Sequence, residues 1–134
     1  MLERDYVMRL VRQFLETLEK LKEKKEADAF AVKKEIQQLY LTYFGHSATY
    51  FCQADVDEIL SLLKSSYASN GLLCRMEMLA ELYYYDASIK TSVVDRRKMW
   101  SKSLSFFEYI DSHSDTFSFE RREKIAKIKD LLKQ

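Results

Sequence analysis

The fold is decided by residues 72–89, which read LLCRMEMLAELYYYDASI. One set of apolar residues in this stretch recurs at helical spacing, which places the set on a single helix face. These residues are Leu72, Met76, Leu79, Leu82, Tyr83 and Ile89. Further apolar side chains lie on other faces, at Leu73, Met78, Tyr84 and Tyr85. A helix that is apolar on several faces is expected to be central and to contact more than one neighbour.

Helical spacing continues on both sides of this stretch and predicts an all-α protein. The expected helices are residues 5–25, 29–44, 72–89, 93–113 and 118–132, with a shorter one following Asp55. Residues 46–54, HSATYFCQA, show the least periodicity and are expected to form a partly ordered connection. The chain is therefore expected to contain about six antiparallel helices, as a helical bundle or a right-handed helical array.

Composition supports helices independently of periodicity. The chain has no proline and only two glycines, Gly45 and Gly71, whereas sandwiches and barrels need many turns that use these residues. Helices joined by polar caps need far fewer. We expect Asp28 and Asp55 to cap helix N-termini, with Glu58 completing a capping box after Asp55. Gly45 is expected to supply a left-handed residue at a helix C-terminus.

The length of 134 residues fits one domain. Its clearest internal break is the polar segment SSYASNG at residues 65–71, where Ser69 or Asn70 could cap the following helix. We therefore expect a single helical domain over residues 1–134. Its N-terminal helices occupy residues 1–66, and a hairpin followed by a C-terminal helix occupies residues 71–134.

Charge and cysteine content narrow the expected partners and compartment. The chain has 22 Lys and Arg against 21 Asp and Glu, so it lacks the basic excess on which nucleic-acid binding usually rests. No run approaches 18 apolar residues, so a membrane partner is not expected. Cys52 and Cys74 lie in apolar surroundings, which favours reduced thiols and a cytoplasmic protein, although a disulfide between them stays open.

Within residues 76–115 the pattern resembles a tetratricopeptide-type helical hairpin. The segment Leu79-Ala80-x-x-Tyr83 is similar to the L-G-x-x-Y core of that repeat's first helix, with Met76 where a large residue is usual. The usual tryptophan is absent. The resemblance implies that the small Ala80 lets two helices approach closely while Tyr83 fills the space beside them.

The second helix of the hairpin continues the resemblance. The segment Ser103-x-x-x-Phe107-x-x-Ile110 is similar to the repeat's A-x-x-x-F-x-x-A, with Ile110 in place of a small residue. The small Ser103 is then expected opposite Ala80. The whole chain also looks like a family of short uncharacterised bacterial helical proteins, a domain of unknown function, and this likeness implies a fold more than an activity.

Motifs for catalysis, metals and cofactors are absent from the sequence. His46 and His113 are the only histidines, and neither belongs to an H-E-x-x-H or a Glu-x-x-His pattern. No G-x-S-x-G elbow occurs, and two glycines are too few for a phosphate-binding loop. We therefore expect no catalytic, metal-binding or cofactor-binding residues, and no enzyme activity.

Two features point to an interaction surface. Because successive helix positions point about 100° apart, Tyr83, Tyr84 and Tyr85 cannot all face one core. Either one of them reaches a second interface or solvent, where tyrosine is favoured in binding, or several neighbouring helices bury all three. Arg96 and Arg97 begin the next helix, so Tyr84, Tyr85, Arg96 and Arg97 form the candidate interaction surface.

The preferred hypothesis is a non-enzymatic, helical-repeat-like interaction module that binds a protein segment in a groove or associates with itself. A small-ligand binder or enzyme with a dispersed site between helices is the first alternative. A nucleic-acid accessory protein that uses the C-terminal basic helices is the second, although its basic residues are interleaved with acidic ones.

Overall fold

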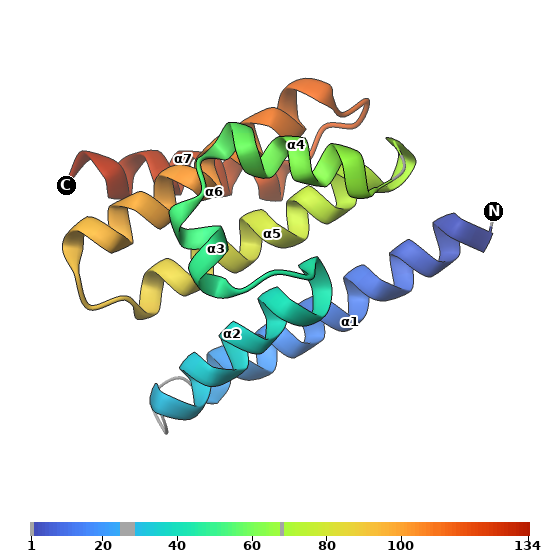
Figure 1. Ribbon diagram of the computed structural model, residues 1–134. Coiled ribbons are helices and arrows are strands. Elements are labelled where there is room, and N and C mark those ends of the chain that lie inside the picture. Colours follow the sequence, from blue (N-terminus) through green and yellow to red (C-terminus); the bar gives the residue numbers. More distant parts are fainter. Residues whose placement is uncertain (1, 25–28, 68) are drawn as a thin grey trace. The chain divides into compact units, whose positions relative to one another are not determined.

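The computed structural model describes residues 2–24, 29–67 and 69–134, and every regular element in these ranges is an α-helix (Figure 1). The expected all-α class is therefore confirmed. The helices are α1 (Leu2–Lys24), α2 (Ala29–Phe44), α3 (Ala48–Gln53), α4 (Val56–Ser66), α5 (Ser69–Ile89), α6 (Val93–His113) and α7 (Phe119–Lys133).

The connection expected to be partly ordered at residues 46–54 contains a short helix, α3, which adds one helix to the expected six. Ser47 caps it, because the Ser47 hydroxyl accepts a hydrogen bond from the Tyr50 backbone amide at 3.1 Å. Phe51 is fully buried, and its ring centroid lies 5.4 Å from that of Tyr40 and 5.8 Å from that of Phe44. A helix of six residues is too short to show periodicity in the sequence. Its stability depends on tertiary packing, here of the buried Phe51 ring.

The helix ends agree with several expected caps. The Asp55 carboxylate accepts a hydrogen bond from the Glu58 amide at 2.8 Å, and Gly45 has a φ of +77°. Asp28 lies outside the described residues. Helix α5 begins at Ser69, so Ser69 lies within the helix and not before it as a cap. The backbone amides of the first helical turn have no partner within the helix, so polar residues are tolerated at these positions.

The chain divides into two compact units, residues 1–62 and residues 63–134. The first contains α1, α2, α3 and the first part of α4, and the second contains the end of α4 with α5, α6 and α7. The division falls near the break expected at residues 65–71. The expectation that residues 1–134 form a single domain stays a prediction.

In the first unit, α1 packs against α2 through an apolar face with added aromatic contacts. The Phe14 ring lies edge-on to Tyr43 at 5.1 Å and to Phe44 at 6.4 Å between centroids. Further along α1, Leu18 and Leu21 are buried at the same helical spacing. Since α2 ends beside Phe14, the N-terminal half of α1 continues past it (Figure 1).

In the second unit, α5 packs along α6, and α6 packs along α7. Helix α5 is buried on several faces, as its apolar residues predict. The Tyr83 and Phe106 rings stack at 6.1 Å between centroids and fill part of the space between α5 and α6. From α7, Ile125 and Ile128 complete the buried core. This three-helix arrangement positions the candidate site.

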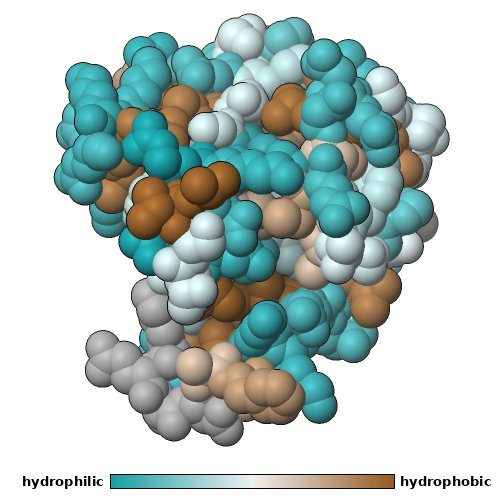
Figure 2. All heavy atoms as spheres, turned by 60° about the vertical axis from the view of Figure 1, so that its left-hand side comes forward, coloured by the Kyte–Doolittle hydropathy of each residue, from teal (hydrophilic) through white to brown (hydrophobic). Residues whose placement is uncertain are grey.

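Some apolar side chains are exposed on the surface and do not belong to these cores. On the face drawn in Figure 2, hydrophilic residues cover much of the surface, and hydrophobic residues show in smaller patches between them. In the second unit, the exposed large apolar residues include Val93 and Val94 at the start of α6 and Phe119 at the start of α7. Single exposed apolar residues are common on folded proteins, so these helix starts do not by themselves identify a site.

Candidate functional site

The hairpin of α5 and α6 brings together the residues with repeat-like spacing. All seven are buried: Met76, Leu79, Ala80, Tyr83, Ser103, Phe107 and Ile110. The Ser103 hydroxyl donates a buried hydrogen bond of 2.8 Å to the Ala80 backbone carbonyl, so Ser103 contacts α5 at Ala80. Because this bond joins a side chain of α6 to the backbone of α5, the two helices lie close together at this level.

The three consecutive tyrosines point in different directions. Tyr83 and Tyr85 are buried, at 0% and 4% exposure, whereas Tyr84 is half-buried. Burial therefore removes Tyr85 from the candidate interaction surface and raises the pKa of its phenol. The face of the Tyr84 ring is covered by two α7 ammonium groups, with Lys124 Nζ at 4.5 Å and Lys127 Nζ at 5.8 Å from its centroid.

Arg96 and Arg97 bind helix ends within their own unit. The Arg96 guanidinium donates two hydrogen bonds to the Lys90 carbonyl, just after α5 ends. The Arg97 guanidinium donates to the carbonyls of Leu132 and Gln134 at the end of α7. Since the last carbonyls of a helix have no partner within it, both arginines satisfy and neutralise such termini. Each has a structural contact that its sequence position did not reveal.

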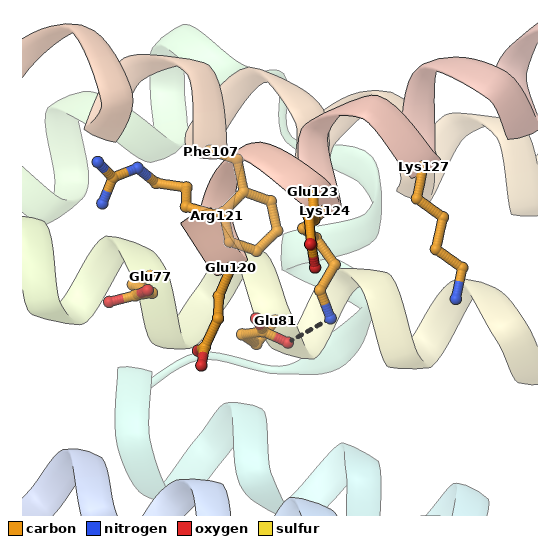
Figure 3. Close-up of a pocket in the computed structure, with 8 residues that line it drawn as sticks. All are labelled: Glu77, Glu81, Phe107, Glu120, Arg121, Glu123, Lys124 and Lys127. Atoms are coloured by element: carbon orange, nitrogen blue, oxygen red, sulfur yellow. Dashed lines mark hydrogen bonds and ion pairs between the residues drawn. The ribbon is translucent and has the colours of Figure 1, made fainter. Parts of the chain in front are cut away.

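A cleft of about 350 Å³ lies between α5 and α7, and the Phe107 ring of α6 forms part of its lining (Figure 3). Its lining residues are Glu77, Glu81, Phe107, Glu120, Arg121, Glu123, Lys124 and Lys127. In Figure 3, Lys124 reaches from α7 toward Glu81 of α5, and their ion pair spans 3.4 Å. The cleft is therefore lined mainly by charged side chains on two facing helices.

The cations of the cleft are already engaged by the protein. Arg121 is 6% exposed, and its guanidinium donates to the Asp111 carboxylate at 3.1 Å and to the Thr116 carbonyl at 2.9 Å. Lys124 pairs with Glu81 and, like Lys127, lies over the Tyr84 ring. Arg121 and Lys124 are thus paired with carboxylates of the protein, whereas Lys127 forms no ion pair among the described residues.

The carboxylates are less fully compensated. Among the described residues, Glu77, Glu120 and Glu123 form no ion pair. Burial raises the pKa of Glu77 above its ordinary value of 4.5, and the nearby charges of Glu81 and Glu120 raise it further, while Arg121 opposes them. The raised pKa therefore reflects burial first and the neighbouring carboxylates second.

Sequence reasoning missed this cleft. Glu77 and Glu81 are four residues apart on α5, and Glu120, Glu123 and Lys127 share a face of α7. Those spacings identify two charged faces, but only the packing of α5 beside α7 turns them toward each other. In the sequence alone, each of these patterns therefore looks the same as a charged helix face that is exposed to solvent.

The basic residues of α7 are mostly paired with acids. Arg122 pairs with Asp111 at 3.2 Å, and Lys129 lies 3.8 Å from Glu108. Neither histidine lines the cleft: His46 follows α2 and lies tilted against the Tyr50 ring, and His113 ends α6 and stacks on Tyr109. Among the described residues, no group of three His, Cys, Asp or Glu side chains is arranged to hold a metal ion.

Comparison with protein-family models, with curated proteins and with solved structures finds no match to this chain. The geometry of the cleft is thus the basis for any functional argument. In the described part of the chain, no helix combines the length and the apolar character needed to cross a membrane.

Proposed function

We propose that this protein is a non-enzymatic interaction module whose second unit, residues 63–134, binds a protein segment that carries lysine or arginine. The observation that supports this proposal is the cleft between α5 and α7, where Arg121 and Lys124 pair with carboxylates of the protein. Among the described residues, three further carboxylates of the cleft form no ion pair. A cationic side chain entering the cleft would meet Glu77, Glu120 and Glu123.

The hairpin beneath the cleft supports binding by a preformed surface. Phe107 lines the cleft and is itself buried among the residues with repeat-like spacing. Helical-repeat proteins bind extended partners on surfaces made by stacked helices. A tetratricopeptide-like arrangement of α5 and α6 is therefore part of the proposal, as is a cytoplasmic location for the protein.

A small cationic ligand is the second candidate, because a volume of about 350 Å³ falls within the range of small-molecule sites. Such a ligand would use the same carboxylates without the apolar contacts of a peptide. A nucleic-acid partner has less support, since Arg122 and Lys129 of α7 are paired with acidic residues and the net charge is only +1.

The test is fluorescence anisotropy of the full chain with a panel of labelled peptides that differ only in charge. We expect peptides with two or more lysines or arginines to bind, and acidic peptides of equal length not to bind. Changing Glu77 and Glu120 together to glutamine should weaken binding at least tenfold. The matched control is Glu108→Gln, which removes a carboxylate that lies outside the cleft.

The same experiment separates the two candidates. If a simple diamine competes with the basic peptide only at far higher concentrations, the segment-binding proposal is supported. If the diamine binds as tightly as the peptide, the small-ligand alternative replaces it. Equal binding of acidic and basic peptides would refute a role for the cleft carboxylates.

A further inference from the structure

Lys127 is an exposed residue of α7 that lines the cleft, and among the described residues it forms no ion pair. Its ammonium group lies over the half-buried Tyr84 ring, 5.8 Å from the centroid. Glu123 precedes Lys127 by four residues, a spacing that permits an ion pair within the helix, but the structure shows none between these two residues. An exposed pair of that kind contributes little in any case. Lys127 is therefore able to bind an anion that enters the cleft.

The contacts between α5 and α7 fix the order of the charges along the cleft. The pKa of Glu77 is raised by burial first, and then by the charges of Glu81 and Glu120, which places Glu120 near Glu77. One turn further along both helices, Lys124 pairs with Glu81 at 3.4 Å. Lys127 follows after almost another turn of α7, and Figure 3 shows it at the opposite end of the cleft from Glu77. The cleft thus runs from two carboxylates, past an ion pair, to an ammonium group.

Helix geometry gives the distance between these two ends. Glu120 and Lys127 are seven residues apart on α7. Seven residues make about two turns and rise by about 10 Å, so both side chains leave the helix in nearly the same direction. A segment in the polyproline II conformation repeats every three residues, and its residues i and i+3 share one face about 9 Å apart. Unfolded chains adopt this conformation readily, so a short segment can match the cleft without forming a helix or a strand.

We propose that Lys127 determines specificity in the cleft by selecting a partner segment in which a basic residue and an acidic residue are three positions apart. The basic side chain binds at Glu77 and Glu120, and the acidic side chain binds Lys127. The two residues between them need no charge, because Glu81 and Lys124 neutralise each other at that level. This inference rests on the proposed function and adds the acidic half of the partner's charge pattern.

The overall charge of the cleft predicts the opposite preference. Its lining residues include four carboxylates and three cations. An acidic residue in the partner therefore weakens the general attraction to the cleft, because it lowers the positive charge of the segment. A gain in affinity from that acidic residue requires a specific contact such as the one with Lys127.

Fluorescence anisotropy of the full chain with three labelled peptides tests the inference. Each peptide carries two adjacent lysines. The first has glutamate three positions after the second lysine, the second has glutamine there, and the third has the glutamate directly after the lysines. We expect the first peptide to bind about threefold more tightly than the other two, as one exposed ion pair provides. Lys127→Gln should remove this advantage. The matched control is Lys129→Gln, which changes an exposed lysine of α7 outside the cleft and should retain it.

Charge reversal gives a second test. Lys127→Glu should reverse the preference, so that a peptide with lysine in place of the glutamate binds more tightly than the glutamate peptide. Circular dichroism of each variant establishes that the helices are retained. If the parent chain binds the glutamine peptide as tightly as the first peptide, or if the advantage of the first peptide survives Lys127→Gln, the inference is wrong and the proposed function stands. If the parent chain binds none of the peptides, the proposed function fails and the inference fails with it.

Discussion

Enlarging Ala80 is the most direct test of the close contact between α5 and α6. Ala80 is fully buried, and the Ser103 hydroxyl lies 2.8 Å from its carbonyl oxygen. Ala80→Leu adds three carbon atoms at this point. The helices must separate, or neighbouring side chains must leave their preferred rotamers, to accommodate them.

The expected loss in the free energy of unfolding has two sources, the packing around Ala80 and the hydrogen bond from Ser103. Overpacking of a buried site costs about 1–3 kcal/mol. If the helices separate far enough to break the bond from Ser103, a further loss of about 0.5–1.5 kcal/mol follows. Helix propensity cannot produce this loss, because alanine and leucine are both strong helix formers.

Urea unfolding followed by circular dichroism measures the effect. With a slope of about 2 kcal/mol per molar urea, a loss of about 2 kcal/mol lowers the midpoint by about 1 M. The matched control is Ala126→Leu on α7, where the parent alanine is exposed and the change should be nearly neutral. If Ala80→Leu and Ala126→Leu unfold at the same urea concentration as the parent, then the two helices do not approach closely at Ala80.

Three further changes have defined outcomes. Phe107→Ala should lower the free energy of unfolding by about 3–5 kcal/mol, measured in urea, because it leaves a cavity beneath the cleft. Asp111→Ala leaves the buried Arg121 guanidinium without its carboxylate and should cost about 3–5 kcal/mol, whereas the exposed Asp130→Ala should be nearly neutral in the same assay. Glu77→Gln should raise the melting temperature at pH 7 and not below pH 4.5, since a raised folded-state pKa means that ionisation of Glu77 destabilises the fold increasingly as pH rises from 4.5 through that pKa. An equal gain from Glu77→Gln at both pH values would contradict the raised pKa.

Local chemistry was enough to predict most helices and some of their ends. Gly45 adopts a positive φ after α2, and Asp55 accepts the Glu58 amide before α4. Such interactions involve residues within one turn of each other, so their spacing in the sequence reveals them. The hydrogen bond from Ser103 to the Ala80 carbonyl is consistent with the close approach of two helices that small residues at these positions predict.

Tertiary structure alone decided the features that join distant segments. Helix α3 exists because Phe51 is buried against aromatic rings of α2, and six residues carry no periodic signal. Arg97 binds carbonyls 35 and 37 residues away, so nothing near it in the sequence indicates this contact. Glu77 of α5 and Glu120 of α7 also lie far apart in the sequence, so nothing near either residue indicates that they line one cleft.

The sequence therefore determined an all-α chain, since helical spacing, caps and the lack of proline are local properties. It did not determine which charged faces would meet. Glutamates on an exposed helix face and glutamates that face another helix have the same spacing in the sequence. Only the element that packs against the helix distinguishes them. The packing of α7 beside α5 brings Glu77 and Glu120 into one cleft, and the resulting desolvation and repulsion raise the pKa of Glu77.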